Sequence, residues 1–451
     1  MKHTLKYLLF ALLLALATDA AAQTTQWRDI YQAKKKDTLF GIARKYGISV
    51  PDLIEANPEM KKAGYELKKG DTVFIPFEKK QTVAVPASPV VKPTAELDVT
   101  KRAIRIGVML PLHNVDGDGQ RMVEYYRGLL LACEDLKVQG ISTDVRAWNV
   151  PMDADIRETL LEKEAARCDL IFGPLYTKQV RPLSDFCREH DIKLVIPFSI
   201  ESGEVANNGQ VFQVYQSAAR LNERVIGAYL DRFAGYHPVF VDCNDTTSRK
   251  GIFTFNLRKQ LEARNIGYNI TNLTSGEANF AKCFSTTQPN MVILNTGRSP
   301  ELNVALAKID GLKTVHPQLS VSLFGYTEWL MYTKVYLDYF CKYDAYIPTA
   351  AYYNPLSAKT RQVENNYRRW FNEEMRAALP RFALTGYDQV SFFCKGLHKY
   401  GKSFSGIKTE NVHVPLQTPL HFKCVGKGGM QNENLMLIHY KRDRTIESIT
   451  Y

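Results

Sequence analysis

The stretch DTLFGIARKYGIS, residues 37–49, decides the fold of the N-terminal part of the chain. Its first two residues carry side-chain oxygens that accept backbone N–H groups at the start of a helix. Apolar side chains then recur at positions i, i+3, i+4 and i+7 counted from Leu39, which is the spacing of one helix face. Gly47 ends this helix in the left-handed conformation that glycine tolerates, and Ser49 caps a second helix.

The residues on either side complete a small folded unit. Pro51 lies in the first turn of the second helix, where proline is tolerated. This helix ends at Asn57-Pro58, because the residue before a proline disfavours the helical region. Short strands are expected at residues 29–33 and 72–76. The sequence therefore predicts the order strand, helix, helix, strand.

This pattern resembles the LysM family over the whole of Tyr31 to Pro76. The resemblance implies a βααβ fold that binds glycans containing N-acetylglucosamine, such as peptidoglycan or chitin. It places a shallow sugar groove between the loop that opens the first helix and the loop after the second. The matching peptidoglycan-binding positions are Asp37, Thr38, Leu39, Phe40, Asn57, Pro58, Glu59 and Met60.

Two points at this groove stay open from the sequence. Asp37 and Thr38 are expected to cap the helix, and Leu39 to enter the core, whether or not they also touch sugar. The family usually has glycine before the Asp-Thr pair, but this chain has Lys36. A longer side chain at the lip would alter the groove or contact acidic groups of the wall.

The segments around this module indicate export and a linker. Residues 1–22 have a basic start, an apolar run shorter than the ~20 residues that span a membrane, and small residues before Gln23. They are typical of a signal peptide, with a short membrane anchor as the alternative. The LysM module is expected at 27–77, and a Pro-rich linker at 78–102.

Composition narrows the classes of function. The 451 residues carry a net charge of +11 with dispersed basic side chains, so nucleic acid is not an expected partner. The eight cysteines occur singly and without metal-ligand spacing, which favours buried small side chains over disulfides and predicts no metal site. Asp116-Gly117-Asp118-Gly119 hints at a calcium loop, but a plain turn is the favoured interpretation. No nucleophile motif or phosphate loop is present, so we expect no enzyme, no catalytic residue and no cofactor.

Residues 103–451 alternate strands with helices, which predicts a doubly wound, mostly parallel α/β sheet. The length implies two lobes, one of about 103–213 with 350–402 and another of about 214–349 with 403–451. Asp388 is expected to be a helix N-cap. Residues 420–425 and 435–440 are expected to form an antiparallel hairpin. The main expected strands are residues 104–110, 170–172, 193–196, 239–242, 291–294 and 321–324.

Four segments of this part resemble the type 1 periplasmic-binding proteins. They are Ile106–Leu112 with Gly128, Asp169–Thr177, Ile192–Ser199 and Thr385–Asp388. The resemblance implies two lobes joined by three crossovers, with a ligand cleft at the carboxyl ends of the strands. The expected cleft residues are His113, Tyr176, Thr177, Ser199, Tyr215, Asn244, Asp245 and Tyr326.

Two of these positions are open to a second interpretation. Thr177 and Ser199 match hydroxyl positions that hold an amino-acid carboxylate in relatives, and they equally suit helix caps. Tyr176 is bulky where the relatives have small residues. The sequence alone does not choose between these alternatives.

These features lead to an expected function and an alternative. The first is a non-enzymatic, exported, periplasmic protein held to peptidoglycan, whose two-lobed part binds an envelope protein such as a wall synthase, or a small ligand. The alternative is an amino-acid or peptide receptor of an uptake transporter, although a wall tether is unexpected for a shuttle. A wall hydrolase is the least favoured, since no catalytic constellation is visible.

Overall fold

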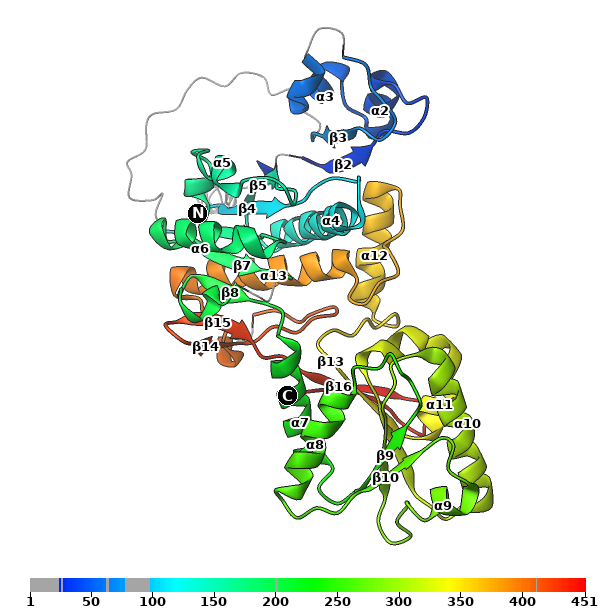
Figure 1. The fold of residues 1–451 in the computed structure, drawn as a ribbon. Helices are drawn as coiled ribbons and strands as arrows, with labels where there is room; N and C mark the ends of the chain where they lie inside the picture. The colour runs from blue at the N-terminus through cyan, green and yellow to red at the C-terminus, as the bar shows by residue number, and fades with distance from the viewer. Residues whose placement is uncertain (1–23, 26, 62–64, 78–97, 199–201, 411) are drawn as a thin grey trace, which may run out of the picture. The chain divides into compact units, whose positions relative to one another are not determined.

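The computed structural model describes residues 24–25, 27–61, 65–77, 98–198, 202–410 and 412–451 (Figure 1). The predicted signal peptide and most of the predicted linker lie outside these residues. The chain divides into two compact units. Unit 1 runs to Tyr215 and includes Tyr353–Glu433, whereas unit 2 comprises Gln216–Tyr352 and Asn434–Tyr451. Among the described residues, no helix is both long enough and apolar enough to cross a membrane.

The N-terminal module of unit 1 has the predicted element order. Strand β2 pairs antiparallel with β3, and two helices and a short 3-10 turn connect them. Ser49 accepts from the backbone of Asp52 at the start of the second helix, and Gly47 ends the first helix at φ 68°. The elements are β2 (Asp29–Gln32), α2 (Leu39–Tyr46), α3 (Val50–Ala56), η1 (Pro58–Lys61) and β3 (Thr72–Ile75).

The rest of unit 1 is an eight-stranded sheet in the order β1-β5-β4-β6-β7-β8-β15-β14. Its neighbours are parallel except for β14 and β15, which pair antiparallel. The strands are β1 (Thr24–Thr25), β4 (Ile104–Leu110), β5 (Thr143–Asn149), β6 (Leu170–Phe172), β7 (Lys193–Ile196), β8 (Val211–Gln213), β14 (Phe422–Val425) and β15 (Gly429–Asn432).

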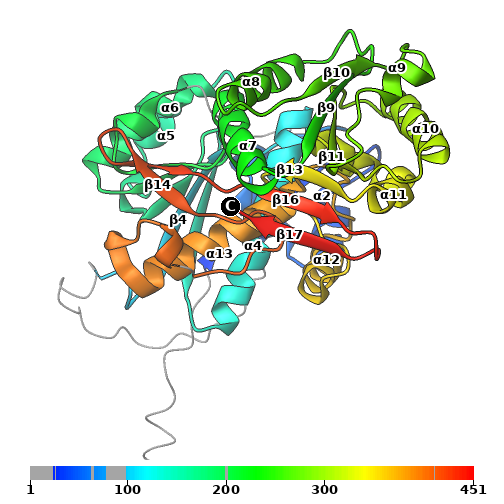
Figure 2. The same ribbon diagram turned by 90° about the horizontal axis from the view of Figure 1, so that it is seen from below.

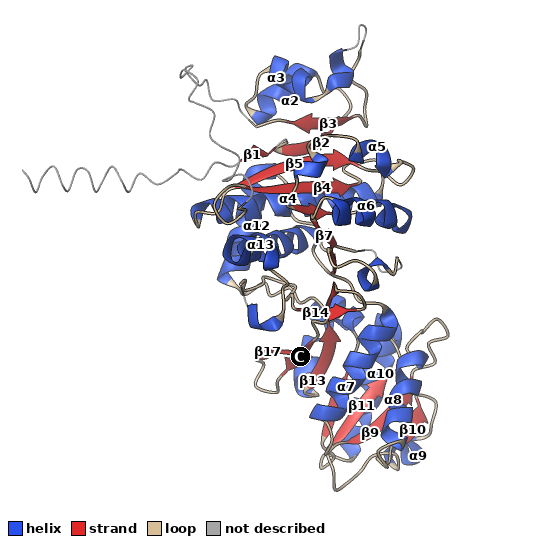
Figure 3. Ribbon diagram, turned by 90° about the vertical axis from the view of Figure 1, so that its left-hand side faces the viewer, coloured by secondary structure: helices blue, strands red, loops and turns tan. Residues whose placement is uncertain are grey.

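Helices cover both faces of this sheet, as Figure 3 shows. One face carries α4, α12 and α13, and the other carries α5 and α6. A separate apolar core lies on each face, because the sheet residues alternate between the two sides. The helices are α4 (Gly117–Val138), α5 (Ile156–Leu160), α6 (Thr177–Glu189), α12 (Ala358–Phe371) and α13 (Phe382–Tyr400).

Unit 2 repeats the architecture with a seven-stranded sheet in the order β10-β9-β11-β12-β13-β16-β17. Its last two strands, β16 and β17, are antiparallel additions beside β13 (Figure 2). The strands are β9 (His237–Asp242), β10 (Asn269–Asn272), β11 (Asn290–Leu294), β12 (Val321–Phe324), β13 (Ala345–Thr349), β16 (Met436–Tyr440) and β17 (Ile446–Thr450). The helices are α7 (Ala218–Arg232), α8 (Gly251–Glu262), α9 (Glu277–Ala281), α10 (Ser299–Val315) and α11 (Thr333–Lys342).

The α/β class with a small module and two doubly wound lobes is thus confirmed. The chain passes between the units after Tyr215, Tyr352 and Glu433, which makes the three crossovers that the resemblance implied. The C-terminal stretch differs from the expected division. Residues 403–433 belong to unit 1, whereas the sequence suggested a second lobe that included all of 403–451.

The predicted hairpin between residues 420–425 and 435–440 is wrong. Strand β14 pairs instead with β15, across the tight turn at Gly426 and Gly428. Residues 436–440 form β16, which belongs to the other sheet and pairs with β13 and β17. Both glycines have positive φ, so a short turn forms here, and the returning strand begins at Gly429 rather than at residue 435 as the alternation suggested.

Asp388 does not cap a helix, and that prediction is also wrong. Helix α13 begins at Phe382, and Asp388 is fully buried within it. Its carboxylate accepts backbone N–H groups of Leu416, Gln417 and Thr418 at 2.7, 2.9 and 2.9 Å. The side chain therefore fixes an irregular segment onto the helix.

Candidate functional site

The loop that opens α2 is held in place by the predicted capping residues. Thr38 accepts the backbone N–H of Gly41 at 3.0 Å. Asp37 accepts the Tyr31 hydroxyl at 2.8 Å and the backbone N–H of Lys34 at 2.7 Å. Partial burial opposes ionisation, but these two donors lower the pKa of Asp37. Asp37 is thus a charged acceptor that organises the loop.

The side chains of this loop differ in exposure. Leu39 is half-buried against the module core, as a structural residue would be. Phe40 is 68% exposed and is a large apolar side chain at the surface. An exposed aromatic ring beside polar backbone is the arrangement on which a sugar ring packs.

The loop after α3 contains both structural and exposed residues. Asn57 is fully buried, donates to the carbonyls of Leu53 and Phe74, and accepts from the backbone N–H of Phe74 at 2.8 Å. Its side chain is thus occupied in joining α3 to β3. Met60 is 6% exposed and lies in the core, whereas Pro58 and Glu59 are exposed. Of this side of the expected groove, only Pro58 and Glu59 present their side chains to solvent.

Lys36 adopts a backbone conformation that is unfavourable for a residue with a side chain. Its φ is 75°, in the left-handed region where a side chain costs about 1–2 kcal/mol and glycine costs little. The positive φ of this turn explains why the family usually has glycine at this position. Lys36 is therefore strained.

Replacing Lys36 with glycine is expected to stabilise the protein by about 0.5–1 kcal/mol, because strain relief exceeds the entropy that glycine adds to the unfolded chain. Chemical denaturation measures this change. Lys35 is the matched control, since it is exposed and is not among the positive-φ residues. If Lys35→Gly stabilised the protein as much, the backbone explanation would be wrong.

The module contacts the rest of unit 1 through a buried ion pair. The Arg127 guanidinium on α4 donates to Asp29 on β2, with Nε–Oδ1 at 2.7 Å and a second bond at 3.2 Å. Asp29 is fully buried and also accepts the Tyr46 hydroxyl at 3.0 Å. Tyr126 donates to the carbonyl oxygen of Trp27 at 2.8 Å.

Apolar contacts accompany this pair. Trp27 and Ile30 belong to the same core as α4 and α13, and Trp27 stacks on Phe74 with ring centroids 4.1 Å apart. The module is thus packed against α4. The sequence does not predict this contact, because its one sign is an acidic residue in a short strand, and the partner of that residue is 98 positions away.

The unit 1 residues of the expected cleft follow the carboxyl ends of parallel strands. His113 follows β4, Tyr176 and Thr177 follow β6, and Tyr215 follows β8. In this order of strands they lie along one edge of the sheet. Ser199 lies outside the described residues.

The surroundings of Tyr176 are acidic. Its hydroxyl donates to Asp118 at 3.2 Å, and burial together with Asp118 raises the pKa of Tyr176 to about 12. Asp118 also pairs with Arg121. Thr177 is the first residue of α6, and Tyr215 is half-buried against Phe198.

The stretch Asp116–Gly119 begins a helix. Asp116 caps α4 by accepting the backbone N–H of Gly119 at 2.8 Å. Within the part of the chain that the structure describes, no three His, Cys, Asp or Glu side chains are grouped to hold a metal ion. Six of the cysteines are buried, Cys283 is half-buried and Cys424 is exposed.

The unit 2 candidates organise their own loops. Asp245 accepts the hydroxyls of Thr247 and Thr296, both at 2.7 Å, and these bonds lower its pKa against the effect of burial. Asn244 has a φ of 56° in the same loop after β9. Tyr326 follows β12 and is 6% exposed, and its buried hydroxyl has no hydrogen-bond partner.

Comparison with known proteins gives two findings. The LysM domain family matches residues 31–76. No curated protein sequence matches the chain.

Among solved structures, a putative branched-chain amino acid ABC transporter protein from Rhodospirillum rubrum has a TM-score of 0.53 at 12% identity. The match covers 77% of this chain and 100% of that one. A branched-chain amino acid ABC transporter periplasmic ligand-binding protein from Burkholderia xenovorans LB400 has a TM-score of 0.46 at 14% identity, over 77% of this chain and 95% of that one. The chain therefore joins a LysM domain at residues 31–76 to a larger α/β part with a type 1 periplasmic-binding-protein-like fold.

Proposed function

We propose that this chain is a non-enzymatic protein of the cell envelope that is held to peptidoglycan by its LysM domain. The observation that carries the proposal is the LysM match at residues 31–76. The exposed ring of Phe40 and the exposed Pro58 and Glu59 support it, because they leave side chains free on both sides of the expected groove. The two-lobed part then engages an envelope protein, such as a wall synthase, or a small ligand.

Point variants of the full chain test the tether better than deletion. Removing the module would leave Arg127 buried without Asp29 and would expose the core around Trp27. Phe40→Ala removes an exposed side chain and is expected to weaken binding to purified peptidoglycan about tenfold, which corresponds to about 1.4 kcal/mol. A sedimentation assay at several protein concentrations measures this affinity.

The matched control is Leu161→Ala, since Leu161 is 85% exposed in unit 1 and far from the module in sequence. It should bind peptidoglycan as the wild type does. Absence of binding by the wild-type chain would overturn the tether. Unchanged binding by Phe40→Ala would overturn the position of the groove.

The receptor function remains the alternative, and the fold supports it as a proposal. A fold shared with the protein from Rhodospirillum rubrum is compatible with an amino acid held at the strand ends. The Asp118 carboxylate beside Tyr176 does not decide against it, because Asp118 is also paired with Arg121. A thermal-shift screen of free amino acids decides the point, and a shift abolished by Thr177→Val would favour the receptor.

A further inference from the structure

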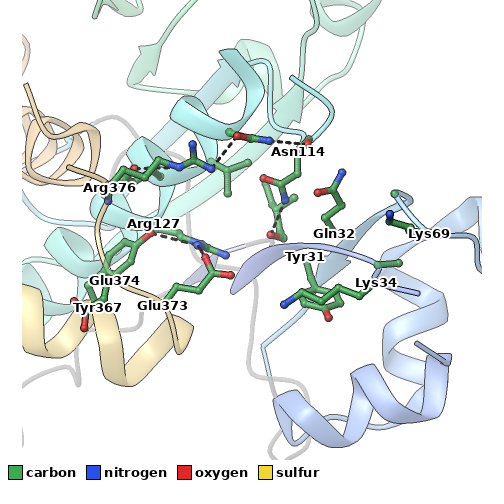
Figure 4. A pocket seen from close by; sticks show the side chains of 16 residues that line it. Tyr31, Gln32, Lys34, Lys69, Asn114, Arg127, Tyr367, Glu373, Glu374 and Arg376 are labelled. Atoms are coloured by element: carbon green, nitrogen blue, oxygen red, sulfur yellow. Dashed lines mark hydrogen bonds and ion pairs between the residues drawn. The ribbon is translucent and has the colours of Figure 1, made fainter. Parts of the chain in front are cut away.

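A pocket lies within unit 1 between the module and the helices that it contacts (Figure 4). Its volume is about 560 Å³, within the range of about 300–1,000 Å³ that holds small ligands. One wall is β2 with the loop at Lys69-Gly70. The other wall is α4 with Tyr367, Glu373, Glu374 and Arg376.

Two carboxylates that line the pocket form ion pairs, whereas two lysines that line it do not. Glu373 pairs with Arg127 at 2.6 Å, and Glu374 pairs with Arg368. On the module side, Lys34 and Lys69 are exposed, and no carboxylate of the described residues forms an ion pair with either. Asp37 lies in the same turn as Lys34 and feels its charge, but neither ammonium group has a carboxylate at ion-pair distance among the described residues, so both are available to an anionic group.

The opposite wall contributes a buried carboxyl group with one oxygen that has no hydrogen-bond partner. Glu124 is 2% exposed, and its Oε1 accepts the backbone N–H of Arg376 at 3.0 Å. Its Oε2 has no hydrogen-bond partner and lies 3.8 Å from Arg376 Nε. Burial raises the pKa of Glu124 to about 7, so the carboxyl is able to donate as well as accept near neutral pH. A ligand with amide or carboxyl groups would satisfy this atom.

The pocket is close to the expected sugar groove. Lys34 lines the pocket, and Asp37 directly precedes Thr38, the N-cap of α2 at the expected groove. Their backbones form one turn, in which Asp37 N–H donates to the Lys34 carbonyl at 3.1 Å. The Cα atoms of such a turn are less than about 7 Å apart. A substituent on a glycan in the groove would thus reach the pocket.

We propose that this pocket binds a carboxylate-bearing peptide that is attached to the glycan strand. The proposal rests on the proposed peptidoglycan tether and adds the peptide as a second point of recognition. Lys34 and Lys69 bind the peptide carboxylate, and Glu124 bonds an amide or carboxyl deeper in the pocket. The LysM module then binds the sugar, and the pocket between the module and α4 binds the attached peptide.

The test uses the full chain and three probes in isothermal titration. The probes are chitotetraose, a disaccharide-tetrapeptide from peptidoglycan, and the same disaccharide-tetrapeptide with its peptide carboxylates amidated. The wild type is expected to bind the carboxylate form about tenfold more tightly than the amidated form. The double variant Lys34→Glu/Lys69→Glu should lose this preference and keep its affinity for chitotetraose.

The matched control is Lys35→Glu/Lys68→Glu, which changes the same charge at exposed neighbours that do not line the pocket. It should keep the preference. Equal wild-type affinity for the carboxylate and amidated forms would overturn the pocket while leaving the tether intact. Loss of chitotetraose binding in the pocket variant alone would also overturn it, because the lysines would then act on the groove. Failure of the wild type to bind any sugar probe would overturn the tether itself.

Discussion

Replacing Gly128 with alanine is expected to lower the free energy of unfolding of unit 1 by about 3 kcal/mol or more. A Cβ atom at Gly128 on α4 would lie 1.8 Å from the carbonyl oxygen of Ala383 on α13. Backbone atoms of a second helix do not move aside as a side chain does. The reciprocal contact is equally close, since a Cβ at Gly386 would lie 2.1 Å from the carbonyl oxygen of Tyr125. These two glycines therefore let the helix backbones touch.

Denaturation followed by tryptophan fluorescence measures the effect, because Trp27, Trp148 and Trp370 belong to unit 1. Gly117→Ala is the matched control in the same helix. A Cβ there would meet only the flexible end of Arg121, at 3.4 Å, so the change should be within about 1 kcal/mol of zero. Comparable stability of the Gly128 and Gly117 variants would contradict the close crossing.

The close crossing of α4 and α13 also explains why some segments of the sequence predicted the fold. Gly128 and the segment Thr385–Asp388 both belong to the parts of the sequence that resemble binding proteins, and both lie where α4 meets α13. Strands such as Ile104–Leu110 and Val321–Phe324 agree with the structure at both ends, because a buried parallel strand is a mostly apolar segment. The module was predictable from its caps, its glycine and its proline, which act locally.

What the sequence could not supply depends on contacts between distant residues. Asn57 was expected to face sugar, but its amide joins Leu53 to Phe74. The true role of Asp388 has no local sign, because the backbone N–H groups that donate to its carboxylate lie 28–30 residues further along the chain. The sequence showed only that Lys36 stands where the family usually has glycine. The positive φ angle shows that this lysine is strained. No pattern in the neighbouring sequence predicts any of these three features.

Replacing Arg127 with methionine is expected to destabilise unit 1 by about 3–5 kcal/mol. The variant would leave the Asp29 carboxylate fully buried with the Tyr46 hydroxyl as its remaining side-chain donor. A buried charge without a partner costs far more than the lost attraction. Burial opposes the charge of Arg127 as well, yet Asp29 raises the pKa of its guanidinium, so the two ions depend on each other.

Denaturation gives the size of this effect, and hydrogen–deuterium exchange of residues 27–32 locates it. Glu373→Gln removes the other carboxylate bonded to Arg127, but its side chain is 52% exposed, so a change below about 1 kcal/mol is expected. The double variant Arg127→Met/Asp29→Asn should recover part of the loss, because no buried charge remains. A loss from Arg127→Met no larger than that from Glu373→Gln would show that the module is not fixed by this pair. A large loss with faster exchange in β2 means that the Arg127–Asp29 pair is a main contributor to holding the LysM module against α4.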